Sequence, residues 1–344
     1  MTSLHNYILQ HIKLPKKSIE NTVQLLDEGS TIPFISRYRK ELTGNLDEVQ
    51  IGEIVKFKEQ FEVLDKRKAT ILKTLEEQEV LTPELQKNIE NAQDLVSLED
   101  LYLPYRKKRK TKADTAREKG LEPLAKIIMA QNKRISNTDL SLLAEKYIKG
   151  DVASEEDALD GARNIIAEWV NERSDIRNMI RHQLDRHAMI STKVVKKYED
   201  DENAQKFRDY FEWNESLNRI PSHRLLAILR ATSEGFIRQK IEIDDDIALE
   251  KIENRIIKSN DAASEQIKVA IEDSYKRLLF PSLSNEALSN AKSKADETAI
   301  AVFSKNLRQL LLGSPLGEKR VLAIDLGFRS GCKLVCLDAQ GNLL

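Results

Sequence analysis

Residues 29–48 read GSTIPFISRYRKELTGNLDE, a stretch that ends one helix, forms a short second helix and starts a third. Gly29 follows LLDE as a helix-ending glycine. Ser30 or Thr31 can cap the next helix, and Pro33 lies in its first turn, where a missing N–H costs nothing. Residues 43–45 (TGN) end that helix, and the acidic residues at 47 and 48 suit the first turn of a long helix.

This pattern predicts a helix-turn-helix element with an apolar side and a basic side. Phe34, Ile35 and Tyr38 are predicted to be buried on the apolar side. Two helices joined by a tight turn can dock on nucleic acid, and the candidate contacts are Arg37, Arg39 and Lys40. The competing interpretation, which the sequence favours at this point, is that these cations pair internally with Glu41, Asp47 and Glu48.

The composition indicates a helical protein with no overall basic field. The chain has 344 residues, enough for two or three domains, with 40% hydrophobic and 32% charged residues. Only 12 Gly and 8 Pro are present, which argues against disorder and against a β-sandwich. The formal net charge is −1, so any nucleic-acid binding must come from local basic patches.

The cysteines and the N-terminus indicate a cytoplasmic protein without a membrane segment. Cys332 and Cys336 are the only cysteines, so no disulfide framework is expected. They fall on one face of a predicted strand, where we expect them to be buried. The N-terminus lacks the apolar core of a signal peptide, and no apolar run is long enough to cross a membrane.

Most of the chain has the spacing of amphipathic helices. A long helix follows the opening stretch and ends near Glu79, and the pattern stays helical from Thr138 to about Tyr198. Residues 237–243 suggest one short strand. Two further helices are expected at about 265–280 and 286–311, separated by Pro281.

A second basic cluster follows a short helix that begins near residue 97. Ser97 and Asp100 resemble a capping-box pair, and Pro104 ends the helix. Beyond it lie Arg106, Lys107, Lys108, Arg109, Lys110 and Lys112. This run could neutralise backbone phosphates, with Tyr102 and Tyr105 stacking on bases. Equally, it could be a solvated loop or a partner surface for acidic segments.

The last 27 residues have the apolar pattern of strands, unlike the helical pattern before them. VLAIDLG (321–327) and CKLVCLD (332–338) read as strands, and residues 339–342 form a tight turn into a third. Three strands with an uncovered apolar face are marginal alone. We therefore expect residues 318–344 to be the start of a further domain that is cut near its beginning.

Five blocks in order resemble the Tex family of bacterial transcription accessory proteins. They are TIPFISRYRKELTGNLDE, LEDLYLPYRKKRKTKADTAREKGLEPLA, KFRDYFEWNESLNRIPSHRLLAILRATSEG, EDSYKRLLFPSL and VLAIDLGFRSGCKLVCLDAQGNLL. The resemblance implies a mainly α, elongated multi-helix scaffold with a helix-turn-helix element, followed by the first strands of an RNase H-like α/β domain of the YqgF type. It implies an N-terminal helical domain over 1–198, a central helical region over 199–317 and the truncated YqgF-like domain over 318–344. In the family, helix-hairpin-helix modules and an OB-type RNA-binding domain follow.

Asp325 is the one candidate for catalysis. RNase H-like nucleases hold divalent metal through an Asp at the end of such a strand, but two-metal chemistry needs several converging carboxylates. Asp338 lies at a turn and is a poor partner, so we interpret Asp325 as vestigial. Histidine and cysteine spacing indicates no metal site, and no cofactor or small-molecule substrate is expected.

The sequence therefore predicts a non-catalytic scaffold for transcription that binds RNA or another single-stranded nucleic acid, with the transcription machinery as a possible partner. Residues 106–112 are the better candidate contact, ahead of Arg37, Arg39 and Lys40. A metal-dependent nuclease of the resolvase type and a pure protein-interaction scaffold remain the alternatives.

Overall fold

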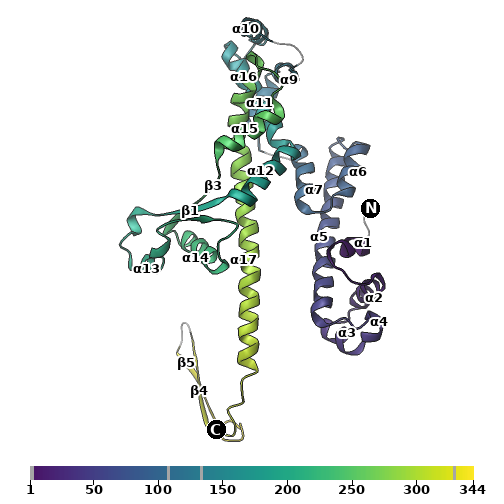
Figure 1. Cartoon of the computed structure of the whole chain (residues 1–344), viewed down its shortest axis with the longest axis vertical. Coiled ribbons are helices and arrows are strands. Elements are labelled where there is room, and N and C mark those ends of the chain that lie inside the picture. Colours follow the sequence, from purple (N-terminus) through teal and green to yellow (C-terminus); the bar gives the residue numbers. More distant parts are fainter. Residues whose placement is uncertain (1–3, 107–108, 132–134, 328–330) are drawn as a thin grey trace. The chain divides into compact units, whose positions relative to one another are not determined.

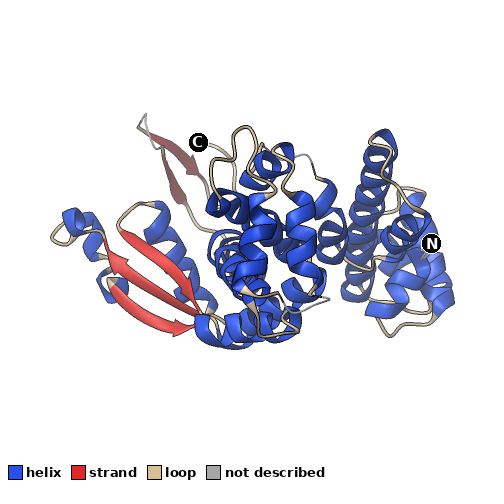
Figure 2. Cartoon of the chain, turned by 90° about the horizontal axis from the view of Figure 1, so that it is seen from above, coloured by secondary structure: helices blue, strands red, loops and turns tan. Residues whose placement is uncertain are grey.

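The computed structural model describes residues 4–106, 109–131, 135–327 and 331–344. Lys107 and Lys108 of the predicted basic cluster lie outside these residues. The predicted mainly α fold is confirmed: helices make up most of the described chain, with one three-stranded sheet and one hairpin (Figures 1 and 2). The chain divides into two compact units. Unit 1 comprises residues 1–187 and 243–287, and unit 2 comprises residues 188–242 and 288–344. The predicted domain boundaries at 198 and 317 stay a prediction.

Unit 1 begins with an N-terminal helical element, in the region where a helix-turn-helix is predicted. Its helices are α1 (Leu4–His11), α2 (Lys16–Asp27), α3 (Ile32–Tyr38), α4 (Lys40–Thr43) and α5 (Glu48–Glu77). Gly29 has a φ of 87° and ends α2, because the left-handed conformation that stops a helix is open to glycine without steric cost. Asp47 accepts a hydrogen bond from the Gln50 N–H at 2.8 Å and forms a capping box that starts α5. The core of this element includes Ile8, Ile19, Ile35, Ile51 and Ile54.

A second cluster packs α6 (Pro83–Asn91), α7 (Leu95–Tyr102) and the 3₁₀ turn η1 (Leu103–Tyr105) against α5. Thr82 caps α6, accepting a hydrogen bond from the Leu85 N–H at 3.2 Å. The predicted capping box of Ser97 and Asp100 is wrong. Asp94 caps α7 instead, accepting from the Ser97 N–H at 2.8 Å. The helix therefore starts two residues before Ser97, which places Asp100 in its interior on the buried side.

The remaining helices of unit 1 gather around α11 (Glu155–Glu172). They are α8 (Lys112–Glu118), α9 (Glu122–Ala130), α10 (Asn137–Glu145), α12 (Ser174–His187), α15 (Asp245–Ile256) and α16 (Ala262–Ser274). Gly161 lies where α11 meets α8 and α9, and a Cβ there would come within 2.2 Å of Leu121 Cδ1. The missing side chain thus allows the helices to approach closely.

The predicted break at Pro281 is wrong. The chain continues from α16 through a π-helical turn (Tyr275–Leu279) into α17 (Phe280–Leu311) without a loop. Pro281 is the second residue of α17 and cannot donate a backbone hydrogen bond. The wider π turn immediately before it changes the hydrogen-bond register, so the helix continues across the proline.

Unit 2 contains an antiparallel sheet of order β2-β1-β3, formed by β1 (Met189–Val194), β2 (Glu212–Ser216) and β3 (Ile237–Glu242). The short strand expected at 237–243 is confirmed. The helical prediction up to Tyr198 is wrong, because Ile190 and Thr192 alternate with more exposed residues at the period of a strand. Helix α14 (Ser222–Ser233) packs against β3. Short turns between β1 and β2 are η2 (Lys196–Tyr198), α13 (Glu202–Gln205) and η3 (Arg208–Tyr210).

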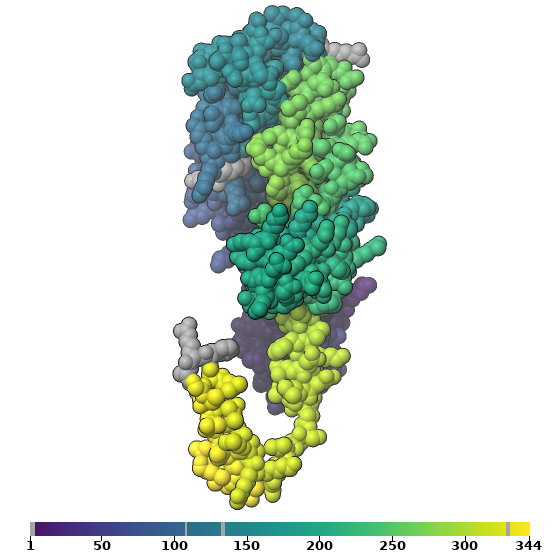
Figure 3. All heavy atoms as spheres, turned by 90° about the vertical axis from the view of Figure 1, so that its left-hand side faces the viewer, coloured from purple at the N-terminus to yellow at the C-terminus, as the bar shows by residue number. Residues whose placement is uncertain are grey.

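The C-terminal strands β4 (Val321–Leu326) and β5 (Cys332–Leu337) form an antiparallel hairpin. The predicted third strand is reduced to one bridge between Leu337 and Leu343. Cys332 and Cys336 are exposed, so their predicted burial is wrong: no described layer covers either face of this hairpin. The last turns of α17 are also uncovered on the face seen in Figure 3, with Phe303 67% exposed.

Candidate nucleic-acid interface

The N-terminal helical element exposes an aromatic pair. Tyr38 is 68% exposed and Phe34 is 38% exposed, with ring centroids 5.5 Å apart. Their predicted burial is wrong. Helix α3 turns Ile35 and Ser36 toward α2 and α5, so positions 34 and 38, four residues apart, share the opposite face. The apolar pattern of a seven-residue helix did not reveal which of its faces packs.

Basic side chains flank these rings, and together Phe34, Tyr38, Arg37, Arg39 and Lys40 form what we call the α3 surface. The Arg39 guanidinium lies over the Phe34 ring, 4.9 Å from its centroid. Arg37 pairs with Glu48 at 3.6 Å, as the internal-pairing interpretation expected, but both side chains are more than half exposed. Such an exposed pair contributes less than about 1 kcal/mol and can open for a ligand.

The second predicted cluster is an exposed loop without exposed rings. Its described members Arg106, Arg109, Lys110 and Lys112 are all exposed, and Lys110 pairs with Glu118 at 2.6 Å. Thr111 and Asp114 cap α8 just beyond it, and the hydrogen bond from the Thr111 N–H lowers the pKa of the Asp114 carboxyl.

The tyrosines beside this loop are not available for stacking. Tyr102 is buried in the core with the Arg67 guanidinium 5.6 Å from its ring, and Tyr105 packs partly buried against the same cluster. The loop therefore offers charge but no exposed aromatic ring.

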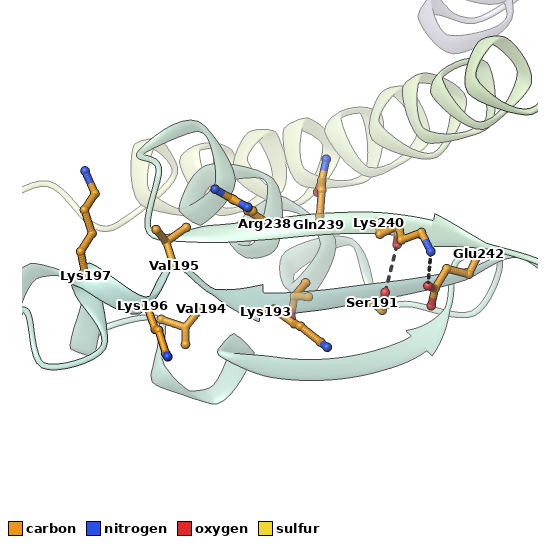
Figure 4. Close-up of a pocket in the computed structure, with 11 residues that line it drawn as sticks. Ser191, Lys193, Val194, Val195, Lys196, Lys197, Arg238, Gln239, Lys240 and Glu242 are labelled. Carbon is orange, nitrogen blue, oxygen red and sulfur yellow. Dashed lines mark hydrogen bonds and ion pairs between the residues drawn. The ribbon is translucent and has the colours of Figure 1, made fainter. Parts of the chain in front are cut away.

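A third basic surface was missed by the sequence reasoning. A hollow of about 860 Å³ in unit 2 is lined by β1, β3 and the start of η2 (Figure 4). Its basic residues are Lys193, Lys196, Lys197, Arg238 and Lys240. They come from two segments more than forty residues apart, and neither segment alone is as basic as residues 106–112. Only the pairing of β1 with β3 brings them together.

The structure places Asp325 on β4, opposite Lys333 of β5. Asp338 accepts from the backbone N–H groups of Gln340 and Asn342, and the Asn342 side chain lowers its pKa. Within the described ranges, no three His, Cys, Asp or Glu side chains come together as a possible metal site.

A search of the described helices finds none that is both long enough and apolar enough to span a membrane.

Comparisons with known proteins identify the family. The model for the Tex-like protein N-terminal domain matches residues 2–76, and the Tex central region-like model matches residues 136–303. The chain belongs to the Tex family. The first Tex match contains the α3 surface, and the second contains the hollow of unit 2.

Relatives in the family are similar along almost all of this chain. It is 39% identical to the uncharacterized protein YdcI of Bacillus subtilis over 99% of its length, and 37% identical to the transcriptional accessory protein Tex of Neisseria gonorrhoeae over 97%. Human S1 RNA-binding domain-containing protein 1 is 30% identical over 94% of the chain. The chain spans 47%, 44% and 33% of these three relatives, which is less than half of each.

Proposed function

We propose that this chain is a non-catalytic scaffold of transcription that binds single-stranded RNA through the α3 surface. The observation that carries the proposal is the exposed Phe34–Tyr38 pair flanked by Arg37, Arg39 and Lys40. The names of two relatives support it, one as a transcriptional accessory protein and the other as a protein with an S1 RNA-binding domain.

The chemistry of the α3 surface suits unpaired bases. An exposed aromatic ring can stack on any base, and such stacking contributes about 1–3 kcal/mol per base. Arg39 already lies over the Phe34 ring, so a guanidinium and two rings form one platform. Arg37 and Lys40 add cations for backbone phosphates, and phosphate contacts bind without reading sequence.

The scaffold role is proposed because the α3 surface is supported by a buried core and by a long helix. Ile35 is fully buried beneath it, among residues of α1, α2 and α5. The 30-residue helix α5 joins this element to the second cluster of unit 1. In this proposal the exposed loop at Arg106, Arg109, Lys110 and Lys112 adds further phosphate contacts, and the transcription machinery is the protein partner.

A catalytic role is not favoured. Asp325 has Lys333 opposite it in the hairpin, and a divalent metal needs several oxygen ligands that converge. A nuclease would require further carboxylates beside Asp325, and Asp338 is instead hydrogen-bonded to its own turn. We therefore propose that Asp325 is vestigial.

The test is a binding titration of a fluorescent single-stranded 12-nucleotide RNA with the 344-residue chain. We expect Tyr38→Ala to weaken binding about 5- to 150-fold, the equivalent of losing one stacked base at about 1–3 kcal/mol. Val63→Ala is the matched control, since it also shortens a side chain that is more than half exposed, on the separate helix α5. Replacing Arg109 and Lys110 by Gln should make the RNA affinity less dependent on salt, while the effect of Tyr38→Ala on affinity should stay the same.

Unchanged affinity in Tyr38→Ala would overturn the α3 surface as the RNA site. Exposed Tyr and Arg are also typical of protein interfaces. If the parent chain bound no RNA at any salt concentration tested, the RNA-binding proposal would fail. The protein-interaction scaffold would then be the favoured function.

A further inference from the structure

We infer that the hollow of unit 2 is a second nucleic-acid site, which holds the phosphate backbone of a single strand without stacking on its bases. The inference rests on the proposed function and adds a surface that lies in the other compact unit, apart from α3 and the 106–112 loop. It follows from the charge, the pairing and the size of the hollow.

The charge of the hollow is strongly positive within a chain of net charge −1. Of the described charged residues that line it, five are basic and only Glu242 is acidic. Lys240 pairs with Glu242 at 2.8 Å, and this hydrogen bond lowers the pKa of the Glu242 carboxyl. Positive charge therefore remains on the hollow after its one carboxylate has been paired.

Among the described side chains, Lys240 is the one basic residue of the hollow that forms an ion pair within 4 Å of a carboxylate. The other ion pairs of the described side chains in residues 188–242 join Lys206 and Arg230 to Glu234, and Arg224 to Glu215. Lys193, Lys196 and Arg238 take part in none of them. Lys197 has an aromatic partner, because its ammonium lies 4.4 Å from the centre of the Tyr198 ring.

The strand register brings like charges together. Lys193 of β1 lies directly opposite Arg238 of β3, and Glu212 of β2 lies opposite Lys193 on its other side, so one carboxylate faces two cations across the sheet. Like charges directly opposite each other in an antiparallel pair destabilise a sheet. A bound polyanion would remove this repulsion, whereas a neutral ligand would not.

The arrangement fits an extended strand of phosphates. Arg238 and Lys240 are two residues apart on β3, so they are separated by about 6.8 Å along the strand. Figure 4 shows the side chains of Lys193 and Lys196 extending to one side of β1, and those of Lys197 and Arg238 extending to the other side. The basic residues thus extend along two paired strands, as a linear polyanion requires.

The size and lining of the hollow suit a single strand that is held without base stacking. Its 860 Å³ lies within the range of about 300–1,000 Å³ that encloses small ligands. That space suits a few nucleotides of one strand and is small for a duplex, whose major groove alone is about 12 Å wide. The described residues that line it include no aromatic ring on which a base could stack.

The test compares two double variants of the 344-residue chain. Lys193→Gln/Arg238→Gln removes two cations from the hollow. Arg208→Gln/Arg219→Gln is the matched control, because it removes two exposed cations of the same unit that do not line the hollow. Each is titrated with single-stranded RNA at several salt concentrations, after circular dichroism has shown an unchanged helix content.

We expect the hollow variant to lower the salt slope by about 1.4, since each single-strand phosphate contact contributes about 0.7. Affinity at 0.1 M salt should then fall roughly 25-fold, and the control should follow the parent chain. RNA carrying 4-thiouridine should also photo-crosslink to peptides from residues 189–197 or 237–242.

Three outcomes would overturn the site. The first is an equal loss of affinity in both double variants. The second is a crosslink pattern that omits both peptides while Tyr38→Ala still weakens binding, which would leave the α3 proposal intact. The third is loss of the crosslink when polyglutamate of equal charge competes at the same concentration as the RNA during irradiation, which would show a surface for acidic protein segments. A parent chain that binds no RNA would overturn both proposals together.

Discussion

Asp100 and Arg177 form a buried ion pair between α7 and α12. The Arg177 Nε donates to Asp100 Oδ1 at 2.7 Å, and the two side chains are 7% and 5% exposed. Arg181, one turn along α12, donates to the same carboxylate and, through Nε, to Glu286 of α17 at 2.6 Å. Burial alone would lower the pKa of Arg181, but its hydrogen bonds to Asp100 and Glu286 raise it. Arg181 thus links two carboxylates, Asp100 of α7 and Glu286 of α17, to α12.

Replacing Asp100 should destabilise the protein strongly. In Asp100→Asn the buried guanidinium of Arg177 loses its counter-charge, and removing one partner of a buried ion pair costs about 3–5 kcal/mol. Asp160→Asn is the control, because Asp160 is 66% exposed and its pair with Arg163 should contribute less than about 1 kcal/mol. Urea unfolding measures both. Equal stabilities for the two variants would contradict a structural role for the buried pair.

Two helical glycines should respond to alanine with opposite signs. In Gly161→Ala the new methyl group would overlap Leu121 Cδ1, and Leu121 is 1% exposed and has little room to move. Overpacking costs about 1–3 kcal/mol, which exceeds the helix-propensity gain of about 0.5–1 kcal/mol. Gly52→Ala in α5 meets no atom within 4 Å and should gain that propensity. Thermal melting would refute this prediction if Tm moved the same way in both variants.

Asp175 should make stability depend on pH in the acid range. Hydrogen bonds from Arg173, and also from Arg255, lower the pKa of Asp175 from 3.8 to about 2. A carboxyl whose pKa is depressed on folding stabilises the protein above the unfolded value, so this contribution is present above pH 4 and lost as pH falls toward 2. Because the side chain is 33% exposed, solvent screening limits it to about 1 kcal/mol. The difference in unfolding free energy between the parent and Asp175→Asn should shrink over this window. A constant difference from pH 5 to pH 2 would contradict it.

Arg238→Gln should leave the sheet as stable as before or more stable. The change removes a like charge opposite Lys193, while Lys193 keeps Glu212 opposite it on β2. Directly opposite pairs change stability by about 0.2–1 kcal/mol, so a gain within that range is expected in denaturant unfolding. Arg224→Gln is the contrast, since it breaks a pair with Glu215 at 2.7 Å and should lower stability. A loss of stability in Arg238→Gln would show that Arg238 supports the sheet.

The sequence was most informative about features that neighbouring residues determine by themselves. The glycine that ends α2, the acidic first turn of α5 at Glu48, the mainly α composition and the family blocks all depend on neighbouring residues, and each was predicted correctly. Asp47, predicted in that first turn, caps the helix instead. Strands β1 and β2 were missed because their alternation is short and follows a long helical stretch. The break at Pro281 was predicted because proline usually ends a helix, whereas the preceding π turn accommodates it.

The sequence by itself determined that this protein is a helical member of the Tex family with basic residues in local clusters, since capping, periodicity and ordered blocks are local properties of the chain. Only the tertiary structure decided which faces of those elements are exposed. Burial of Ile35 turned Phe34 and Tyr38 outward. Pairing of β1 with β3 placed Lys193 opposite Arg238, and packing of α7 against α12 gave Asp100 its buried guanidinium partners. Each of these depends on contacts between segments distant in the chain, which local sequence patterns do not record.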